Sequence, residues 1–342
     1  MMTRRTLGSI LVGLCGAFAG CGGGGTAGTV VVYSSLDPEF SGSILRDYAA
    51  RTGVDVIPKF DVESTKSVGL TQLLMQEAAR PRCDLFWNNE ILNTLRLKDK
   101  GLLAPFRPAH AAAIPEAFRA KDGTWYGFAA RARILLVNTK LVAEADRPRG
   151  IRDLLDPRWK GKIGIAKPLF GSTATHAACL FAAWGEEKAS AYFRDLKANG
   201  VRVFSGNKQV ATAVSSGEVA FGLTDTDDAM GEILAGQAVA IVYPDREPGA
   251  LGTLYIPNTL AIPKGCPHPE AAEALASALL SPEVEARLAE GPSVQVPLLT
   301  TTRAPAQVET PRTVHAMPAD FEAAAKLWDR VARFLEAEFT GG

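Results

Sequence analysis

Short apolar runs alternate with amphipathic segments along the first third of the chain. The runs predict buried strands at residues 29–35, 54–60 and 83–89. The segments that follow them carry apolar residues at helical spacing and predict helices at 38–53, 65–80 and 90–101. Strands that alternate with helices form a mixed, mainly parallel sheet with helices on both faces, because each parallel strand needs a crossover connection. The pattern therefore predicts an α/β fold.

The same alternation resumes after residue 131 and predicts a second unit. Its strands are expected at 162–168 and 219–225, and its helices at 172–185, 186–200 and 207–217. The stretch 248–265 then returns to the first unit, and a long helix is expected at 318–339. A chain of 342 residues exceeds a comfortable single core. We therefore expect two lobes, formed by 29–130 with 254–342 and by 131–253, with hinge crossings near 128–132 and 243–253.

The N-terminus has a basic start, an apolar run from Leu7 to Phe18 and small residues before Cys21. This order is typical of a secretory signal over residues 1–20, and the run is too short to span a membrane as a helix. The four residues FAGC that end at Cys21 resemble a bacterial lipobox, which predicts a lipidated cysteine and a glycine-rich tether over 21–28. The alternatives are an ordinary secretory signal and a twin-arginine export signal. We expect a periplasmic protein that a lipid on Cys21 anchors to the cell membrane.

Charge and sequence motifs exclude several classes of function. Residues 1–20 contain two basic and no acidic side chains, so 35 of the 37 basic residues remain against 37 acidic ones. A nearly neutral chain without a basic block is not expected to bind nucleic acid. Cys83, Cys179 and Cys266 form no zinc-binding CxxC pattern. No GxSxG, P-loop or HExxH sequence indicates an enzyme.

An acidic cluster follows the predicted strand at 219–225. The sequence GEVAFGLTDTDDAM places Asp225, Asp227 and Asp228 within four positions, at the strand end where sites form in parallel sheets. Neighbouring carboxylates repel one another, so we expect them to hold a positive charge, either a metal ion or an ammonium group. The alternative is structural, because Asp225, Thr226 and Asp227 are all competent N-caps for a following helix.

The sequence PLFGSTATHAA offers the opposite chemistry. Gly171, Ser172 and Thr173 begin an apolar helix, and a helix N-terminus with hydroxyl groups binds anions. Arg131 and Arg133 add guanidinium groups that can bind an anion through two hydrogen bonds. As alternatives, the hydroxyl groups cap the helix and the arginines pair with acids. If both charges are bound, the ligand is a cation with a helper anion or one molecule that carries both.

The order of several sequence segments resembles a known family. In chain order, the segments are VVVYSS, CDLFWNNE, ARARILLVNT, RWKGKIG, GEVAFGLTDTDDA and PGALGT. They resemble the ferric-ion-binding branch of the bacterial extracellular solute-binding proteins, which are the receptors of ABC importers, over nearly all of residues 29–300. The resemblance implies the two-lobe periplasmic-binding-protein fold of type II, with a ligand cleft between the lobes.

The resemblance also implies which residues contact the ligand. In that family two adjacent tyrosines hold the ferric ion, and Asp227 and Asp228 stand in the matching places here. With Asp37 and Glu90 they form the implied metal site, although strict alignment puts Asn89 in the place of Glu90. The predicted anion or ligand contacts, from the resemblance and from the strand ends, are Ser34, Ser35, Asn89, Arg131, Arg133, Gly171, Ser172, Thr173, Asn207 and Asp225.

Three aromatic residues near predicted strand ends have two interpretations. Tyr33, Trp87 and Tyr126 are candidates to line the cleft around an organic ligand. The alternative is that each packs in the core.

The resemblance and the acidic cluster together predict the substrate-binding subunit of an ABC importer, not an enzyme. We expect it to be a monomer that captures Fe(III) with a carbonate- or phosphate-like anion, needs no further cofactor, and delivers its ligand to an inner-membrane permease. Carboxylates suit other hard cations equally well. Two alternatives stay open: a small organic zwitterion or anion such as an aminoalkyl phosphonate, and metal-dependent hydrolysis of a phosphoester.

Overall fold

The structure is a computed structural model that describes residues 28–61 and 68–339. The predicted signal segment, Cys21 and the tether up to residue 27 lie outside the described residues. In the part that the structure describes, no helix is both long enough and apolar enough to cross a membrane.

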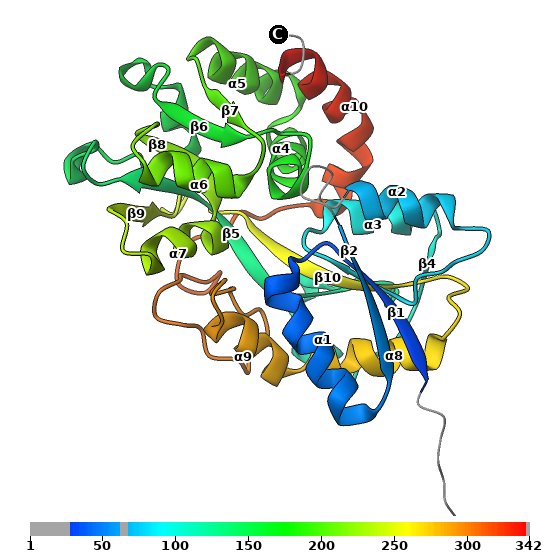
Figure 1. The fold of residues 1–342 in the computed structure, drawn as a ribbon. Coiled ribbons are helices and arrows are strands. Elements are labelled where there is room, and N and C mark those ends of the chain that lie inside the picture. Colours follow the sequence, from blue (N-terminus) through cyan, green and yellow to red (C-terminus); the bar gives the residue numbers. More distant parts are fainter. Residues whose placement is uncertain (1–27, 62–67, 340–342) are drawn as a thin grey trace, which may run out of the picture.

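The first lobe is built on three parallel strands, shown in blue and cyan in Figure 1. They are β1 (Thr29–Ser34), β2 (Asp55–Phe60) and β3 (Leu85–Asn88), and β1 lies between the other two. The helices after them are α1 (Pro38–Thr52), α2 (Val68–Gln76) and α3 (Leu92–Asp99). Each element agrees with the alternation in the sequence, although α2 and α3 are shorter than predicted.

The second lobe repeats this arrangement in the upper half of Figure 1. Its parallel strands are β6 (Ile163–Ala166), β7 (Arg202–Phe204) and β8 (Phe221–Asp225), with β6 between the other two. Its helices are α4 (Gly171–Trp184), α5 (Glu186–Ala198), α6 (Asn207–Ser215) and α7 (Thr226–Leu234). The carboxyl end of β8 therefore leads directly into the N-terminus of α7.

One long strand, β5 (Tyr126–Asn138), runs through both lobes. Its first part pairs antiparallel with β10 (Tyr255–Pro263), and its second part pairs antiparallel with β8 and β9 (Val239–Val242). The short β4 (Leu103–Ala104) pairs with β10. The sheet order is β2-β1-β3-β10-β5-β8-β6-β7. The sequence pattern predicted the crossing near 128–132 but not one continuous strand, and it missed β7 and β9.

A third segment lies against the two predicted crossings. Val296 pairs with Ala130 of β5, and Ala316 pairs with Thr253 just before β10. Gly252 has a φ of 90° and lies against the backbone of Ala316. This third segment therefore packs along both predicted crossings.

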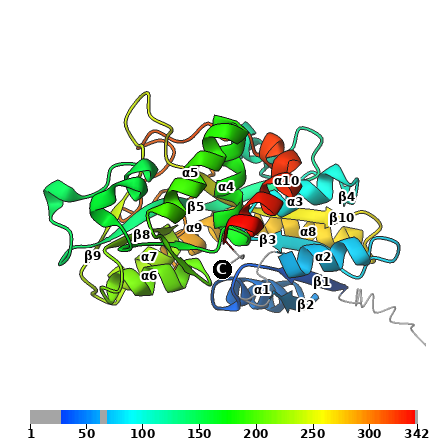
Figure 2. The same cartoon turned by 90° about the horizontal axis from the view of Figure 1, so that it is seen from above.

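Three further helices complete the fold: α8 (Pro269–Leu279), α9 (Pro282–Glu290) and α10 (Phe321–Phe339). Short 3-10 helices lie at Ala111–Ala113, Glu116–Phe118, Glu144–Asp146, Ile151–Leu155 and Pro157–Trp159. Figures 1 and 2 both show α10 alongside α4 and α3. Phe334 of α10 packs on Phe181 of α4 with ring centroids 5.6 Å apart, and Asp329 pairs with Arg96 of α3 at 3.2 Å. The last helix thus contacts both lobes, whereas the predicted division assigned it to the first.

All thirteen residues of β5 are buried. Most are apolar, as expected for a strand covered on both faces. Two of them, Arg131 and Arg133, are arginines with exposed fractions of 2% and 0%. Since a buried cation needs paired charges, acidic partners are expected beside these two side chains.

Candidate functional site

Arg131 and Arg133 lie two residues apart on β5, so their side chains leave the same face of the sheet. β8 runs antiparallel beside them, and Arg133 is directly opposite Asp225. Continuing that register by two residues brings Arg131 opposite Asp227, which is already in the first turn of α7. The arginines and two of the three clustered aspartates therefore meet across one strand pair.

The Arg133 guanidinium is surrounded by acceptors from three elements. Its Nη1 atom donates to Asp225 Oδ1 at 2.6 Å, to Asn207 Oδ1 at 3.1 Å and to Ser172 Oγ at 3.3 Å. Its Nη2 atom donates to Thr173 Oγ1 at 3.3 Å. The side chain is thus fixed between β8 and the N-terminal ends of α4 and α6.

Asp225 lies between Arg133, Ser172 and Asn207, which all donate to its carboxylate. Its Oδ2 atom accepts hydrogen bonds from the Ser172 hydroxyl group and, at 3.0 Å, from Asn207 Nδ2. Asp225 occupies the N-cap position of α7, but its side chain makes no capping hydrogen bond there. The structural alternative of an N-cap is therefore wrong for Asp225, whose carboxylate binds across the sheet instead. We call Arg133, Ser172 and Asn207, with Asp225 between them, the Asp225 cradle.

Arg131 links the end of β3 to the start of α7. Its Nε atom donates to Asp227 Oδ2 at 3.1 Å, and its Nη1 atom donates to the carbonyl oxygen of Asn89. Burial by itself lowers the pKa of Arg131, but the carboxylates of Asp227, Asp225 and Asp228 raise it overall. The Nη2 atom of Arg131 is buried without a hydrogen-bond partner among the described residues. One donor therefore remains for a ligand.

The aspartates come close enough to share an ion. One carboxylate oxygen from each of Asp225, Asp227 and Asp228 lies within 4.8 Å of the others. Three carboxylates beside two guanidinium groups leave one net negative charge when all are ionised. The carboxylates were expected to hold a positive charge from a ligand, but two of them are already paired with arginines of the chain.

Glu90 was expected in the metal site, and the structure places it elsewhere. It is 1% exposed, and its carboxylate accepts from the backbone N–H groups of Leu92 at 2.6 Å and Asn93 at 3.1 Å, at the start of α3. It also accepts from the Asn88 amide at 3.1 Å and the Thr175 hydroxyl of α4 at 2.7 Å. Glu90 is therefore a buried helix cap that joins the two lobes, because four donors already satisfy both oxygens.

Asp37 also lies apart from the aspartate cluster. It occupies the N-cap position of α1 and is half-buried. It is not among the carboxylates that come within ligating distance of one another in the described part of the chain. The structure therefore brings together two of the four predicted metal ligands, Asp227 and Asp228, and adds Asp225.

The serines at the end of β1 organise the neighbouring chain. Ser35 Oγ donates to Asn88 Oδ1 at 2.7 Å and accepts from the backbone N–H of Asn89 at 3.0 Å. Ser34 Oγ donates to the carbonyl oxygen of Leu36 at 3.1 Å. Asn89 Oδ1 is buried without a partner among the described residues. Of this group, Asn89 alone presents a buried polar atom that is left for a ligand.

The three aromatic candidates pack in the first lobe, so the interpretation as cleft residues is wrong. Trp87 is fully buried, with its ring centroid 5.5 Å from that of Phe128. Tyr126 is buried, and its hydroxyl donates to the carbonyl oxygen of Phe106 at 2.9 Å. Tyr33 is buried and donates to Glu77 Oε2 at 3.0 Å.

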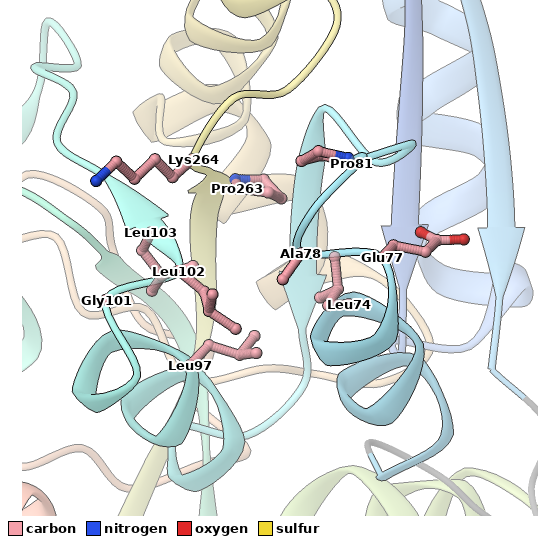
Figure 3. Close-up of a pocket in the computed structure, with 10 residues that line it drawn as sticks. All are labelled: Leu74, Glu77, Ala78, Pro81, Leu97, Gly101, Leu102, Leu103, Pro263 and Lys264. Atoms are coloured by element: carbon pink, nitrogen blue, oxygen red, sulfur yellow. The ribbon is translucent and has the colours of Figure 1, made fainter.

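A cavity of about 240 Å³ lies in the first lobe, between α2, α3 and the end of β10. Figure 3 shows that its lining is mainly leucine, alanine and proline, and that the Lys264 amino group points away from Leu97 and Leu74. None of the predicted site residues lines it. This cavity is therefore separate from the arginine–aspartate site.

The sequence was compared with known proteins once this geometry was clear. A family model described as bacterial extracellular solute-binding protein matches residues 84–323. The chain belongs to this family. Membership confirms the resemblance and the predicted fold class, and it makes the chain a solute-binding protein and not an enzyme.

Individual proteins of known name show the same likeness. "Iron uptake protein A1" of Synechocystis sp. is 27% identical over 270 residues, which are 76% of this chain and 73% of the relative. A putative 2-aminoethylphosphonate-binding periplasmic protein of Salmonella typhi is 26% identical over 242 residues, 66% of this chain and 69% of the relative. The crystal structure of iron-bound HitA from Pseudomonas aeruginosa superposes with a TM-score of 0.80 at 24% identity, covering 90% of this chain and 99% of that one.

One feature of this site had no signal in the sequence, and a second was predicted only as an alternative. Thr175, the partner of Glu90, carried no signal, because its role depends on how the two lobes meet. The two ion pairs did have a sequence signal. The arginines of ARAR on one strand and the aspartates of TDTD at the end of its antiparallel neighbour are both spaced i, i+2. Opposite charges at that spacing predict cross-strand pairs as soon as the two strands are known to be neighbours.

Proposed function

We propose that the chain is the substrate-binding subunit of an ABC importer and that it captures a hard metal cation, with Fe(III) as the favoured substrate. The observation that carries the proposal is the aspartate cluster, in which Asp225, Asp227 and Asp228 bring carboxylate oxygens within 4.8 Å of one another. Carboxylate oxygens are hard ligands that bind such ions. The likeness to proteins named for iron uptake supports the same substrate.

Asp227 and Asp228 are the proposed principal ligands. Both are half-buried in the first turn of α7, so an ion can reach them. Arg131 would hold Asp227 in place through its bond at 3.1 Å. Binding of a helper anion is treated separately, because Arg133, Ser172 and Asn207, which were predicted to bind it, already contact Asp225.

Capture is proposed to occur between the lobes. β5 and the stretch before β10 connect them, and closure around these crossings would bring the first lobe over α7. The closed form would then deliver its ion to an inner-membrane permease. A periplasmic location, a lipid on Cys21 and a monomeric state complete the proposal.

Native mass spectrometry and elemental analysis of protein purified without chelators test the substrate class. We expect one iron ion per chain. Asp227→Asn and Asp228→Asn should each lower the affinity for Fe(III), supplied as its citrate complex, by about 100-fold or more, as expected when a charged ligand is lost. Asp153→Asn is the matched control, since Asp153 is a half-buried acid whose Oδ2 accepts from the backbone N–H of Gly150 at 3.0 Å, outside the aspartate cluster and the predicted crossings.

A small organic zwitterion is the second candidate. The observation that favours it is the unpartnered Arg131 Nη2 beside the aspartates, which offers a donor for an anionic group next to acceptors for an ammonium group. The relative named for 2-aminoethylphosphonate binding is consistent with such a ligand. An organic mass in the native spectrum, with a rise of the melting temperature in 2-aminoethylphosphonate and none in Fe(III) citrate, would replace the metal proposal with this one.

A further inference from the structure

The Asp225 cradle resembles an anion site that is already filled. Ser172 and Thr173 lie in the first turn of α4, Asn207 begins α6, and Arg133 reaches them from β5. All four are among the residues predicted to bind a free anion. In the structure Arg133, Ser172 and Asn207 converge on the carboxylate of Asp225. Thr173 instead accepts from Arg133 Nη2 at 3.3 Å and donates to Asn207 Oδ1 at 3.1 Å.

The positive charge and the hydrogen-bond donors that could bind one anion are already used by the Asp225 carboxylate. Asp225 supplies one negative charge, and Arg133, whose side chain is fully buried, supplies one positive charge at 2.6 Å. Ser172 and Asn207 donate to the second oxygen of the same carboxylate. A free anion that entered would have to displace a buried, hydrogen-bonded carboxylate and leave it without its counterion, which is strongly unfavourable.

We propose that Asp225 takes the place of a separate helper anion, so that this protein binds its cation without a second, co-bound anion. The inference rests on the proposed capture of a cation and narrows the substrate class from a cation–anion complex to the cation alone. Its physical basis is local: the carboxylate is covalently part of the chain, so the negative charge is present at every encounter with the ion. A free anion would have to be bound from solution.

Asp225→Asn should turn the cradle into a true anion site. The amide keeps the shape of the side chain but removes its charge, which leaves the buried Arg133 guanidinium without a counterion. Inorganic phosphate can then bind between Arg133, Ser172 and Asn207. Because phosphate would bind the folded form alone, it should raise the stability of the variant by mass action.

Thermal unfolding with inorganic phosphate tests this first, with sodium chloride used to match ionic strength. We expect about 10 mM phosphate to raise the melting temperature of Asp225→Asn saturably, by about 3 °C or more, and that of the wild type by less than about 1 °C. Glu285→Gln is the matched control: Glu285 is also a buried acid, but it accepts from the backbone N–H groups of Ala129, Leu298 and Leu299. Phosphate should not raise the melting temperature of Glu285→Gln.

Saturable stabilisation of the wild type by phosphate would overturn the proposal, and this measurement needs no variant to fold. A folded Asp225→Asn that gains no stability from phosphate would overturn it as well, since Asp225 would then be only half of a structural ion pair. Neither outcome depends on the metal, so the inference can fail while the proposed function stands.

Metal titration provides the second measurement. Phosphate also binds Fe(III) in solution, so the ratio of wild-type to Asp225→Asn affinity is compared with and without it. We expect this ratio of affinities to fall at least tenfold when phosphate is added, because phosphate replaces the missing negative charge only in the variant. A ratio that phosphate leaves unchanged contradicts the inference. If the wild type binds Fe(III) under no condition, the proposed function is wrong. The thermal measurement alone then tests the inference about Asp225.

Discussion

Arg133 Nη1 lies 2.6 Å from Asp225 Oδ1, where β5 pairs with β8, and both side chains are buried. Two residues further along the same antiparallel register, Arg131 pairs with Asp227 at 3.1 Å. The two pairs differ in access to solvent, because Asp225 is enclosed by α4 and α6 while Asp227 is half-buried in the first turn of α7. The Arg133–Asp225 pair is therefore shielded from solvent, whereas the Arg131–Asp227 pair is partly accessible to it.

Breaking the enclosed pair should be costly. Arg133→Met or Asp225→Asn alone is expected to lower the free energy of unfolding by about 3–5 kcal/mol, because each leaves one buried charge unpaired. The double variant should lose less than the sum of the two, which denaturant unfolding measures as a coupling energy. Arg202→Met at the exposed Arg202–Glu218 pair is the control and should cost less than about 1 kcal/mol. Additive losses would contradict the pairing.

Glu90 is expected to act on stability and not on the ion. Glu90→Gln should lower the free energy of unfolding by about 1–3 kcal/mol, because one carboxylate oxygen becomes an amide N–H that faces the donors of α3. Thr175→Val removes the bond to α4 and should cost less than Glu90→Gln does. Isothermal titration with Fe(III) citrate should give affinities within about threefold of the wild type for both. A 100-fold loss in Glu90→Gln alone would return Glu90 to the metal site.

His176 makes stability depend on pH. Burial, with a contribution from the nearby Arg133 charge, lowers the pKa of His176 well below its usual value. The unfolded chain therefore takes up a proton as the pH falls through about 6.5 while the folded protein does not, so stability is lost toward acid pH at up to about 1.4 kcal/mol per pH unit. Unfolding midpoints between pH 7 and 5 should show this slope in the wild type and a shallower one in His176→Leu.

Gly252 is expected to be irreplaceable where the crossing segments meet. It has a φ of 90°, and a Cβ atom there would lie 2.5 Å from the backbone nitrogen of Met317 and 2.6 Å from the carbonyl carbon of Ala316. Gly252→Ala should therefore lower the free energy of unfolding by at least about 1–3 kcal/mol, by forcing the third segment away. Gly231→Ala in α7 is the control, since its Cβ meets nothing within 4 Å, and it should be neutral or stabilising. Equal stability of both variants would show that the segments are not tightly held.

Much of the fold could be predicted because its signals are local. The strands at β1, β2, β3, β6 and β8 and the helices α1, α4, α5 and α6 lie within a few residues of the predicted ranges. Apolar periodicity and turn residues act over one element and are visible without a partner. β7 and β9 were missed because they span only three and four residues, and an apolar run that short does not distinguish a strand from other structure.

The candidate site was predicted only in outline. Asp225, Asp227, Arg131 and Arg133 were all identified, but as separate binders of a cation and of an anion. Glu90 was placed in the metal site although it caps a helix, because cap and ligand use the same carboxylate chemistry and differ only in which donors come near. The sequence left open whether Trp87 packs in the core or lines the cleft, and its contact with Phe128 places it in the core.

From the sequence alone follow the α/β class, the family, and the presence of both charges near the ends of particular strands. Whether those charges neutralise one another was decided by the tertiary structure. Arg133 and Asp225 are 92 positions apart in the chain, and only the pairing of β5 with β8 makes them neighbours. The energy of an ion pair depends on distance and burial, and both are properties of the folded sheet that no stretch of sequence carries by itself.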